Sequence, residues 1–162
     1  MLLFSTNKGD FTIELFADDA PISSENFLAY ADSGFFDGLI FHRVIPGFMI
    51  QGGGFDTDMK QKDGNAPIKN EAKNGKKNLR GTLSMARTND INSASSQFFV
   101  NLKDNDFLDN SPGSFGYAVF GQVISGMDVI DAIAKEKTSR KGHHDDVPVD
   151  AVIINKVSRV EE

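Results

Sequence analysis

Alternating apolar and polar residues open the chain. Residues 2–5 and 11–16 are short strand-like runs, and in the second run three apolar residues alternate with Thr12 and Glu14. The polar segment TNKGD joins the two runs. Because successive side chains of a strand point to opposite faces, this pattern predicts a β-hairpin with one apolar face.

Two segments carry apolar residues at helical spacing. In the first, Phe27 and Tyr30 fall on one face. Pro21 suits a first helical turn and Gly34 can end the helix, which predicts a helix over about 21–32. Apolar residues three to four positions apart predict a second helix over 127–134.

The remaining apolar runs are short and predict strands. A long polar segment, residues 52–79, has no clear period, and loops of this length are often functional. Many short strands with two helices indicate a mainly β fold, either an antiparallel barrel or a sandwich. No repeat or linker divides the chain, so we expect residues 1–162 to form one domain. The further expected strands are 39–44, 48–51, 82–86, 97–102, 117–123 and 151–160.

Composition narrows the possible functions. The chain has 14 Phe but only 2 Tyr and no Trp, enough rings to fill a core or line an apolar groove. Its net charge of −6 makes nucleic-acid binding through the overall field a poor expectation. Residues 56–80 differ from the rest of the chain in charge. Seven basic residues outnumber four acids there, so this segment has a net charge of +3 and the rest of the chain has a net charge of −9. We expect that segment to be a solvated loop rather than a docking patch for an acidic partner.

Cysteine is absent, which excludes disulfides, a thiolate nucleophile and a cysteine-based metal site. The first residues read as a strand and carry no signal-peptide pattern, and no apolar run reaches membrane-spanning length. The sequence therefore predicts a soluble cytoplasmic protein that does not enter membranes.

Three other patterns suggest ligand sites that we discount. The glycines 52–54 lack the Lys-Ser/Thr pair of a phosphate loop, so a close backbone approach is the better interpretation. The acids of residues 56–63 do not have the offsets of a calcium-binding loop. Residues 143–146, HHDD, could bind a metal, but Lys141-Gly142 and Pro148 indicate a surface loop with a solvated turn. We expect neither a metal nor a cofactor.

Several longer segments together resemble one family. They are FHRVIPGFMIQGGG from Phe41, GTLSMARTN from Gly81, SASSQFFVNL from Ser93, FLDN from Phe107 and YAVFGQVISGMDVIDAI from Tyr117. In this order and spacing they resemble the cyclophilins, the cyclosporin-type peptidyl-prolyl cis-trans isomerases. The resemblance covers essentially the whole chain and is closest to the single-domain cytosolic cyclophilins of bacteria. It implies a closed eight-stranded antiparallel barrel capped by two α-helices.

The resemblance also implies which residues act. Arg43 matches the catalytic arginine of the family, and we expect Gln51 to orient Arg43 or to hold the substrate backbone. For His42, which matches a conserved neighbour, a structural role is slightly favoured over a catalytic one. The substrate-binding set implied by the resemblance is His42, Phe48, Met49, Ala86, Arg87, Gln97, Phe99, Phe107, Leu108 and Tyr117.

The chemistry expected from this set is rotation about an X–Pro peptide bond. Twisting the amide returns a lone pair to its nitrogen, and a fixed hydrogen-bond donor aimed at that nitrogen stabilises the twisted form. Arginine is always charged, rigid and donor-only. On a strand, Arg43 should share a face with Phe41 and Ile45 and reach over an apolar groove. The expected floor of that groove is Phe48, Met49, Phe99 and Leu108, although the first three, taken alone, would be read as ordinary core residues.

Three residues depart from the family pattern. Phe107 replaces a tryptophan whose ring nitrogen can donate a hydrogen bond to cyclosporin, which predicts weak cyclosporin binding. Tyr117 replaces a histidine and keeps an aromatic wall with a polar tip. Arg87 replaces an asparagine and adds charge near the groove, which puts the backbone contact there in doubt.

The leading hypothesis is therefore a monomeric isomerase that acts on proline-containing peptides and on unfolded or flexible polypeptides, and so assists protein folding. A second hypothesis is a module that binds proline-bearing segments without catalysis, although binding alone does not need a donor aimed at the nitrogen. A third, a small-ligand β-barrel carrier, needs an open interior, which the abundance of Phe disfavours.

Overall fold

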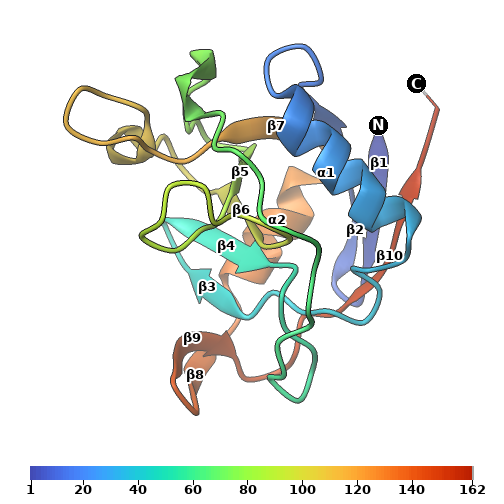
Figure 1. Cartoon of the computed structure of the whole chain (residues 1–162). Coiled ribbons are helices and arrows are strands. Elements are labelled where there is room, and N and C mark those ends of the chain that lie inside the picture. Colours follow the sequence, from blue (N-terminus) through green and yellow to red (C-terminus); the bar gives the residue numbers. More distant parts are fainter. Residues whose placement is uncertain (162) are drawn as a thin grey trace.

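An eight-stranded antiparallel sheet lies at the centre of the molecule (Figure 1). A computed structural model describes residues 1–161. The strand order is β10-β1-β2-β7-β5-β6-β4-β3, and the sheet curls into a barrel-like shape. The mainly β fold predicted from the short alternating runs is thus confirmed. The strands are β1 (Leu2–Thr6), β2 (Gly9–Leu15), β3 (Arg43–Ile45), β4 (Met49–Gly52), β5 (Thr82–Met85), β6 (Phe98–Asn101), β7 (Val119–Ser125) and β10 (Ile154–Arg159).

The barrel closes through a short seam rather than a full strand ladder. Its two edge strands, β3 and β10, are joined where Ile40 bridges Ile153, just before each strand begins. The Ile154 N–H donates to the Leu39 carbonyl at 2.8 Å beside this bridge. Since β3 has only three residues, it is too short to pair along β10, and "closed" describes the sheet only at this point.

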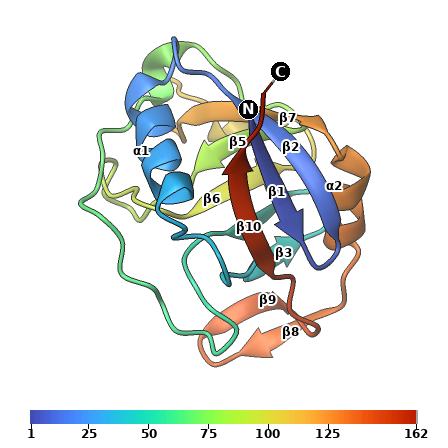
Figure 2. The same cartoon turned by 90° about the vertical axis from the view of Figure 1, so that its right-hand side faces the viewer.

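Two helices cover the barrel on opposite sides, α1 (Pro21–Asp32) and α2 (Met127–Ala134), with the bounds that the sequence predicted (Figure 2). Phe27 and Tyr30 of α1 are buried against the barrel. Ile130 and Ile133 do the same for α2. Within residues 1–161, no helix is long and apolar enough to cross a lipid bilayer.

Phenylalanine rings fill the barrel interior. Phe27 packs against Phe98 with ring centroids 5.3 Å apart and against Phe120 at 5.1 Å. Phe4 stacks on Phe11 at 4.7 Å. All of these rings are at most 1% exposed, so the interior is a packed core and not the open cavity that a carrier barrel would need.

A second, two-stranded sheet corrects one sequence-based prediction. Residues 143–146 were expected to lie in a solvated surface loop, but they belong to a hairpin of β8 (Thr138–Lys141) and β9 (His144–Pro148). Gly142 takes a φ of +61° at the turn. The hairpin packs beside β3 at the lower edge of the barrel in both views (Figures 1 and 2).

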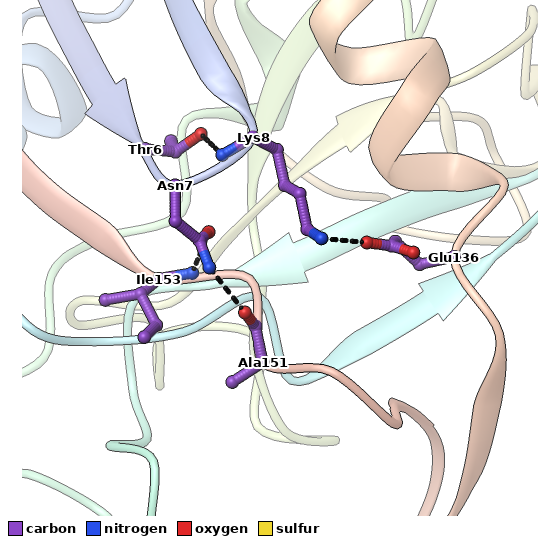
Figure 3. Close-up of polar contacts among 6 residues, drawn as sticks. All are labelled: Thr6, Asn7, Lys8, Glu136, Ala151 and Ile153. Atoms are coloured by element: carbon purple, nitrogen blue, oxygen red, sulfur yellow. Dashed lines mark hydrogen bonds and ion pairs between the residues drawn. The ribbon is translucent and has the colours of Figure 1, made fainter.

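The β1–β2 turn is tied to the far end of the chain (Figure 3). The Asn7 side chain donates to the Ala151 carbonyl at 2.8 Å and accepts from the Ile153 N–H at 2.8 Å. Lys8 forms an ion pair with Glu136, just after α2, at 2.6 Å. These contacts hold the first hairpin against the segment that forms the closing seam.

The long segment 53–79 runs outside α1 and contains only one short 3₁₀ helix, Ala72–Asn74 (Figure 2). Glu71, just before it, accepts the Ser23 N–H at 2.6 Å and the Ile22 N–H at 3.2 Å. The residue before α1, Ala20, has no side chain that could cap the helix. A distant loop residue therefore satisfies the first backbone donors of α1.

Candidate active site

Strand pairing brings three of the predicted site residues into one row. Arg43 of β3 lies opposite Gln51 of β4, and Gln51 lies opposite Phe99 of β6. Directly paired residues of an antiparallel sheet project to the same face. The row therefore places a cation, an amide and an aromatic ring side by side on the outer face of the barrel.

A cleft of about 150 Å³ opens over this row. Nine of the twelve predicted site residues line it. They come from β3, β4 and β6, from the residues just before β4 and just after β5, from a short 3₁₀ helix (Asp106–Leu108) and from the loop before β7. The lining residues are Arg43, Phe48, Met49, Gln51, Ala86, Arg87, Phe99, Leu108 and Tyr117.

The floor of the cleft is apolar and separate from the main core. Met49, Ala86 and Phe99 are buried together as their own cluster, with Phe48 and Leu108 half-buried beside them. Met49 and Phe99 are as buried as core residues, but the core to which they belong is this small cluster beneath the cleft and not the barrel interior.

The alternation expected around Arg43 holds on only one side of it. Ile45 packs against the cleft cluster and Val44 packs in the main core, as the period of a strand requires. Phe41 was expected on the face of Arg43, but it is fully buried in the main core against Phe98, with ring centroids 5.9 Å apart. The reason is that β3 begins at Arg43, so the strand period does not extend back to Phe41.

A chain of side-chain amides supports Arg43 from below. The Arg43 Nη1 donates to the Gln51 Oε1 at 3.5 Å, a long contact, and the Gln51 Nε2 donates to the Gln97 Oε1 at 3.0 Å. Gln97 does not line this cleft but lies behind Gln51, to which it is hydrogen-bonded. Arg43 itself is exposed, with its guanidinium at the cleft and no acid against it among residues 1–161.

Gly54 is required by this amide chain. A Cβ on Gly54 would lie 2.5 Å from the Gln97 side chain. Gly53 has a φ of +89°, and a Cβ there would lie 2.9 Å from the Ser96 carbonyl oxygen. The interpretation of the glycine run as a close backbone approach fits both positions, and a phosphate loop is not needed to explain it.

The side chain of Arg87 contacts the Tyr117 ring in the wall of the cleft. Its guanidinium carbon is 4.5 Å from the centre of the Tyr117 ring. The Nη2 donates to the Gly116 carbonyl at 3.1 Å and the Nη1 donates to the Thr88 carbonyl at 2.8 Å. This side chain is held by the cleft wall instead of reaching freely into solvent.

Two further predicted residues do not line the cleft. His42 is 4% exposed and packs against Phe55, with ring centroids 4.5 Å apart, on the side of the hairpin β8–β9. Burial, and then the charges of His144 and Arg43, lower the pKa of His42 to about 4. Phe107 is 62% exposed and stacks on Phe48 at 5.7 Å, at the rim of the cleft.

A second cleft of about 210 Å³ adjoins the first. Gln51, Ala86 and Arg87 line both clefts, so the two are continuous along one wall. Of the other lining residues, sequence reasoning predicted Gln97 but missed four polar loop residues that have no period or motif. They are Gln61, in the long segment after β4, and Thr88, Ser93 and Ser95, between β5 and β6.

The site offers a cationic donor beside a buried apolar floor, with neutral amides behind it. No serine, threonine, cysteine or lysine lines the first cleft. Such a site can bind an apolar ring and donate a hydrogen bond to a group attached to that ring.

Comparison with known proteins agrees with this geometry. The family model for cyclophilin type peptidyl-prolyl cis-trans isomerase/CLD matches residues 1–159. The chain is 55% identical over 161 residues to peptidyl-prolyl cis-trans isomerase B of Escherichia coli, covering 98% of each protein. It is 57% identical over 157 residues to the peptidyl-prolyl cis-trans isomerase of Acinetobacter baylyi, covering 97% of this chain and 84% of that one.

Solved structures with a similar fold come from the same family. A cyclophilin type peptidyl-prolyl cis-trans isomerase of Cryptosporidium parvum, crystallised in the presence of the dipeptide Ala-Pro, superposes with a TM-score of 0.83. It is 29% identical in sequence, and the match covers 99% of both chains. The chain thus belongs to the cyclophilin-type peptidyl-prolyl cis-trans isomerases, as its sequence motifs predicted.

Proposed function

We propose that Arg43 is the catalytic group and that the apolar cleft beside it binds the prolyl ring of the substrate. The observation that carries this proposal is the placement of an exposed guanidinium at the edge of a cleft floored by Met49 and Phe99. Its reaction is rotation about an X–Pro bond, the activity for which the family is named.

Arg43 acts on the twisted amide. Planar amides resist rotation by about 18–20 kcal/mol, because resonance gives the C–N bond double-bond character. In the twisted transition state the nitrogen regains its lone pair and can accept a hydrogen bond from the guanidinium. A planar amide nitrogen accepts poorly, so this contact stabilises the transition state more than either ground state. One preorganised donor of this kind is worth about 3–4 kcal/mol.

Gln51 positions that donor. Its Oε1 accepts from Arg43 and its Nε2 is held by Gln97, so the guanidinium is restrained before a substrate arrives. The floor residues hold the prolyl ring and exclude water from the amide. In this proposal Ala86 and Arg87 contact the substrate backbone through their main chain, as the resemblance implies.

The substrates are flexible or unfolded polypeptides, because an X–Pro bond must project into an open cleft to be bound. Cis and trans forms of such bonds differ by only about 1 kcal/mol, so both are populated in flexible chains. Their uncatalysed exchange takes on the order of tens of seconds and can limit folding. Acceleration of this step would assist protein folding.

The experiment is exchange spectroscopy on a short Ala-Pro peptide with the wild-type protein. We expect exchange that is fast relative to the uncatalysed reaction at a substoichiometric concentration of protein. A peptide that binds, by chemical-shift change, without faster exchange would contradict catalysis and favour the non-catalytic binding module.

Cyclosporin provides a second test. Phe107 is exposed at the cleft rim but has no N–H, so it offers stacking without a hydrogen bond. We expect wild-type protein to bind cyclosporin weakly and Phe107→Trp to bind it roughly tenfold more tightly, the gain from about one hydrogen bond. Isothermal titration would measure both affinities. Equal affinities would show that the ring nitrogen at this position does not govern binding.

We further propose that residues 1–162 form one isomerase domain that works as a monomer in the cytoplasm. The family model spans residues 1–159, which supports the single domain. Sedimentation of the purified chain tests the monomer, and cell fractionation tests the location.

A further inference from the structure

Arg87 is a second cation in a cleft system that contains no acid. Arg43 and Arg87 are the only charged residues that line the first cleft, and Arg87 is the only one that lines the adjoining cleft. Within residues 1–161, neither arginine forms an ion pair. This local excess of positive charge contrasts with the chain as a whole, whose net charge is −6.

The Arg87 guanidinium is fixed and still has free donors. Its Nε and Nη2 both donate to the Gly116 carbonyl, at 3.3 and 3.1 Å, and its Nη1 donates to the Thr88 carbonyl at 2.8 Å. A guanidinium carries five N–H groups, so about two remain, one on each terminal nitrogen. Stacking on Tyr117 holds the plane of the group at the wall that both clefts share. Such a preorganised fork suits a carboxylate, because little side-chain freedom is lost on binding.

The surroundings of Arg87 do not neutralise it. The residues around the second cleft are otherwise uncharged amides, hydroxyls and one alanine. Asp90 is the nearest acid along the chain, and its Oδ1 accepts the Asn92 N–H at 2.9 Å, outside both linings. The wall shared by the two clefts thus carries a cation without an acid of the protein to neutralise it. A carboxylate of the substrate could supply that negative charge.

We propose that Arg87 is a specificity-determining residue that favours substrates with an acidic side chain within two residues of the proline. The proposal rests on the proposed function, since it assumes that the prolyl ring occupies the first cleft. A side chain close to that ring in the sequence then falls against the shared wall. Charge pairing at a partly exposed site strengthens binding of ground and transition states alike, so the preference appears in KM more than in kcat.

The test compares matched proline peptides that carry either Glu or Gln at each of the two positions on either side of the proline. For wild-type protein at low ionic strength, we expect kcat/KM for Glu to exceed that for Gln by about three- to fivefold at one position, the size of a partly exposed ion pair. Added salt should lower this ratio. In Arg87→Gln the ratio should fall to about one, and Arg87→Lys should keep part of it.

The control is Arg140→Gln, which removes the same charge from exposed strand β8, away from both clefts. It should keep the wild-type Glu/Gln ratio. A wild-type ratio near one at every position would overturn the proposal, and so would a ratio that survives Arg87→Gln, because the carboxylate would then be recognised elsewhere. Failure to accelerate any peptide would instead contradict the proposed function itself, so the two failures are distinguishable.

Discussion

Gln51 is the only side chain through which Arg43 is hydrogen-bonded to the rest of the barrel among the described residues. In Gln51→Ala the guanidinium loses its acceptor and samples more rotamers. We expect kcat to fall roughly tenfold, the equivalent of one hydrogen bond of about 1.4 kcal/mol, with little change in KM. Peptide exchange rates over a range of substrate concentrations separate the two constants.

Gln122→Ala is the matched control, because Gln122 lies on β7 outside the cleft and bonds to Glu14. It should keep wild-type kcat. Wild-type kcat in Gln51→Ala would show that Arg43 needs no partner to act.

His42 makes stability depend on pH. Its pKa is about 4 in the folded protein and near 6.5 when unfolded, so only the unfolded chain takes up this proton between those values. The contribution of His42 to the free energy of unfolding is therefore full above about pH 6.5. As the pH falls from 6.5 toward 4, the free energy of unfolding decreases by on the order of 3 kcal/mol. Urea unfolding of the wild type between pH 7 and pH 4.5 would show this loss.

His42→Phe should remove most of that pH dependence, because a phenyl ring takes up no proton. The buried Nδ1 of His42 has no hydrogen-bond partner, so the substitution breaks no hydrogen bond at that atom. His143→Gln, at an exposed position in the turn of the hairpin β8–β9, should leave the pH dependence as in the wild type. A wild-type slope in His42→Phe would assign the acid sensitivity to other groups.

The family resemblance was sufficient to predict nine side chains that line one cleft, and strand pairing explains why Arg43, Gln51 and Phe99 meet there. The same reasoning could not place His42 or Gln97. His42 precedes the start of β3, where alternation no longer applies. The position of Gln97 depends on a contact with Gly54, which is distant in sequence.

Helix α1 depends on a residue from another part of the chain. Glu71 accepts two backbone N–H groups of its first turn and ties the long loop to the helix. We expect Glu71→Ala to lower the free energy of unfolding by about 1 kcal/mol, the usual cost of a lost N-cap. Urea unfolding measures this change.

Glu25→Ala is the control, because Glu25 is an exposed residue of the same helix. Its free energy of unfolding should stay close to the wild-type value. If Glu71→Ala unfolds at the same urea concentration as Glu25→Ala, the cap does not stabilise α1.

Both α-helices were predictable to the residue because local signals define their ends, such as Pro21 in the first turn of α1. The hairpin β8–β9 was not predictable. Its strands read TSRK and HDDVP, with almost no apolar alternation. Tertiary packing supplies what the pattern lacks, since His144 packs on Phe55 with ring centroids 4.7 Å apart.

In the whole molecule, the main core and the candidate active site are built from different residues. The main core lies inside the barrel, whereas the cleft cluster of Met49, Ala86 and Phe99 is a second, outer cluster. Arg43 is exposed at its edge. Substitution of Arg43 should therefore change catalysis while leaving the packed interior and its cooperative unfolding intact.

That separation allows a direct test of the claim that Arg43 stabilises the twisted amide. The measurement is kcat/KM for exchange of an Ala-Pro peptide by Arg43→Ala, with Arg140→Ala as the control and circular dichroism to confirm the fold. We predict a loss of roughly a hundredfold or more in Arg43→Ala and wild-type activity in the control. A natively folded Arg43→Ala with wild-type kcat/KM would contradict the account.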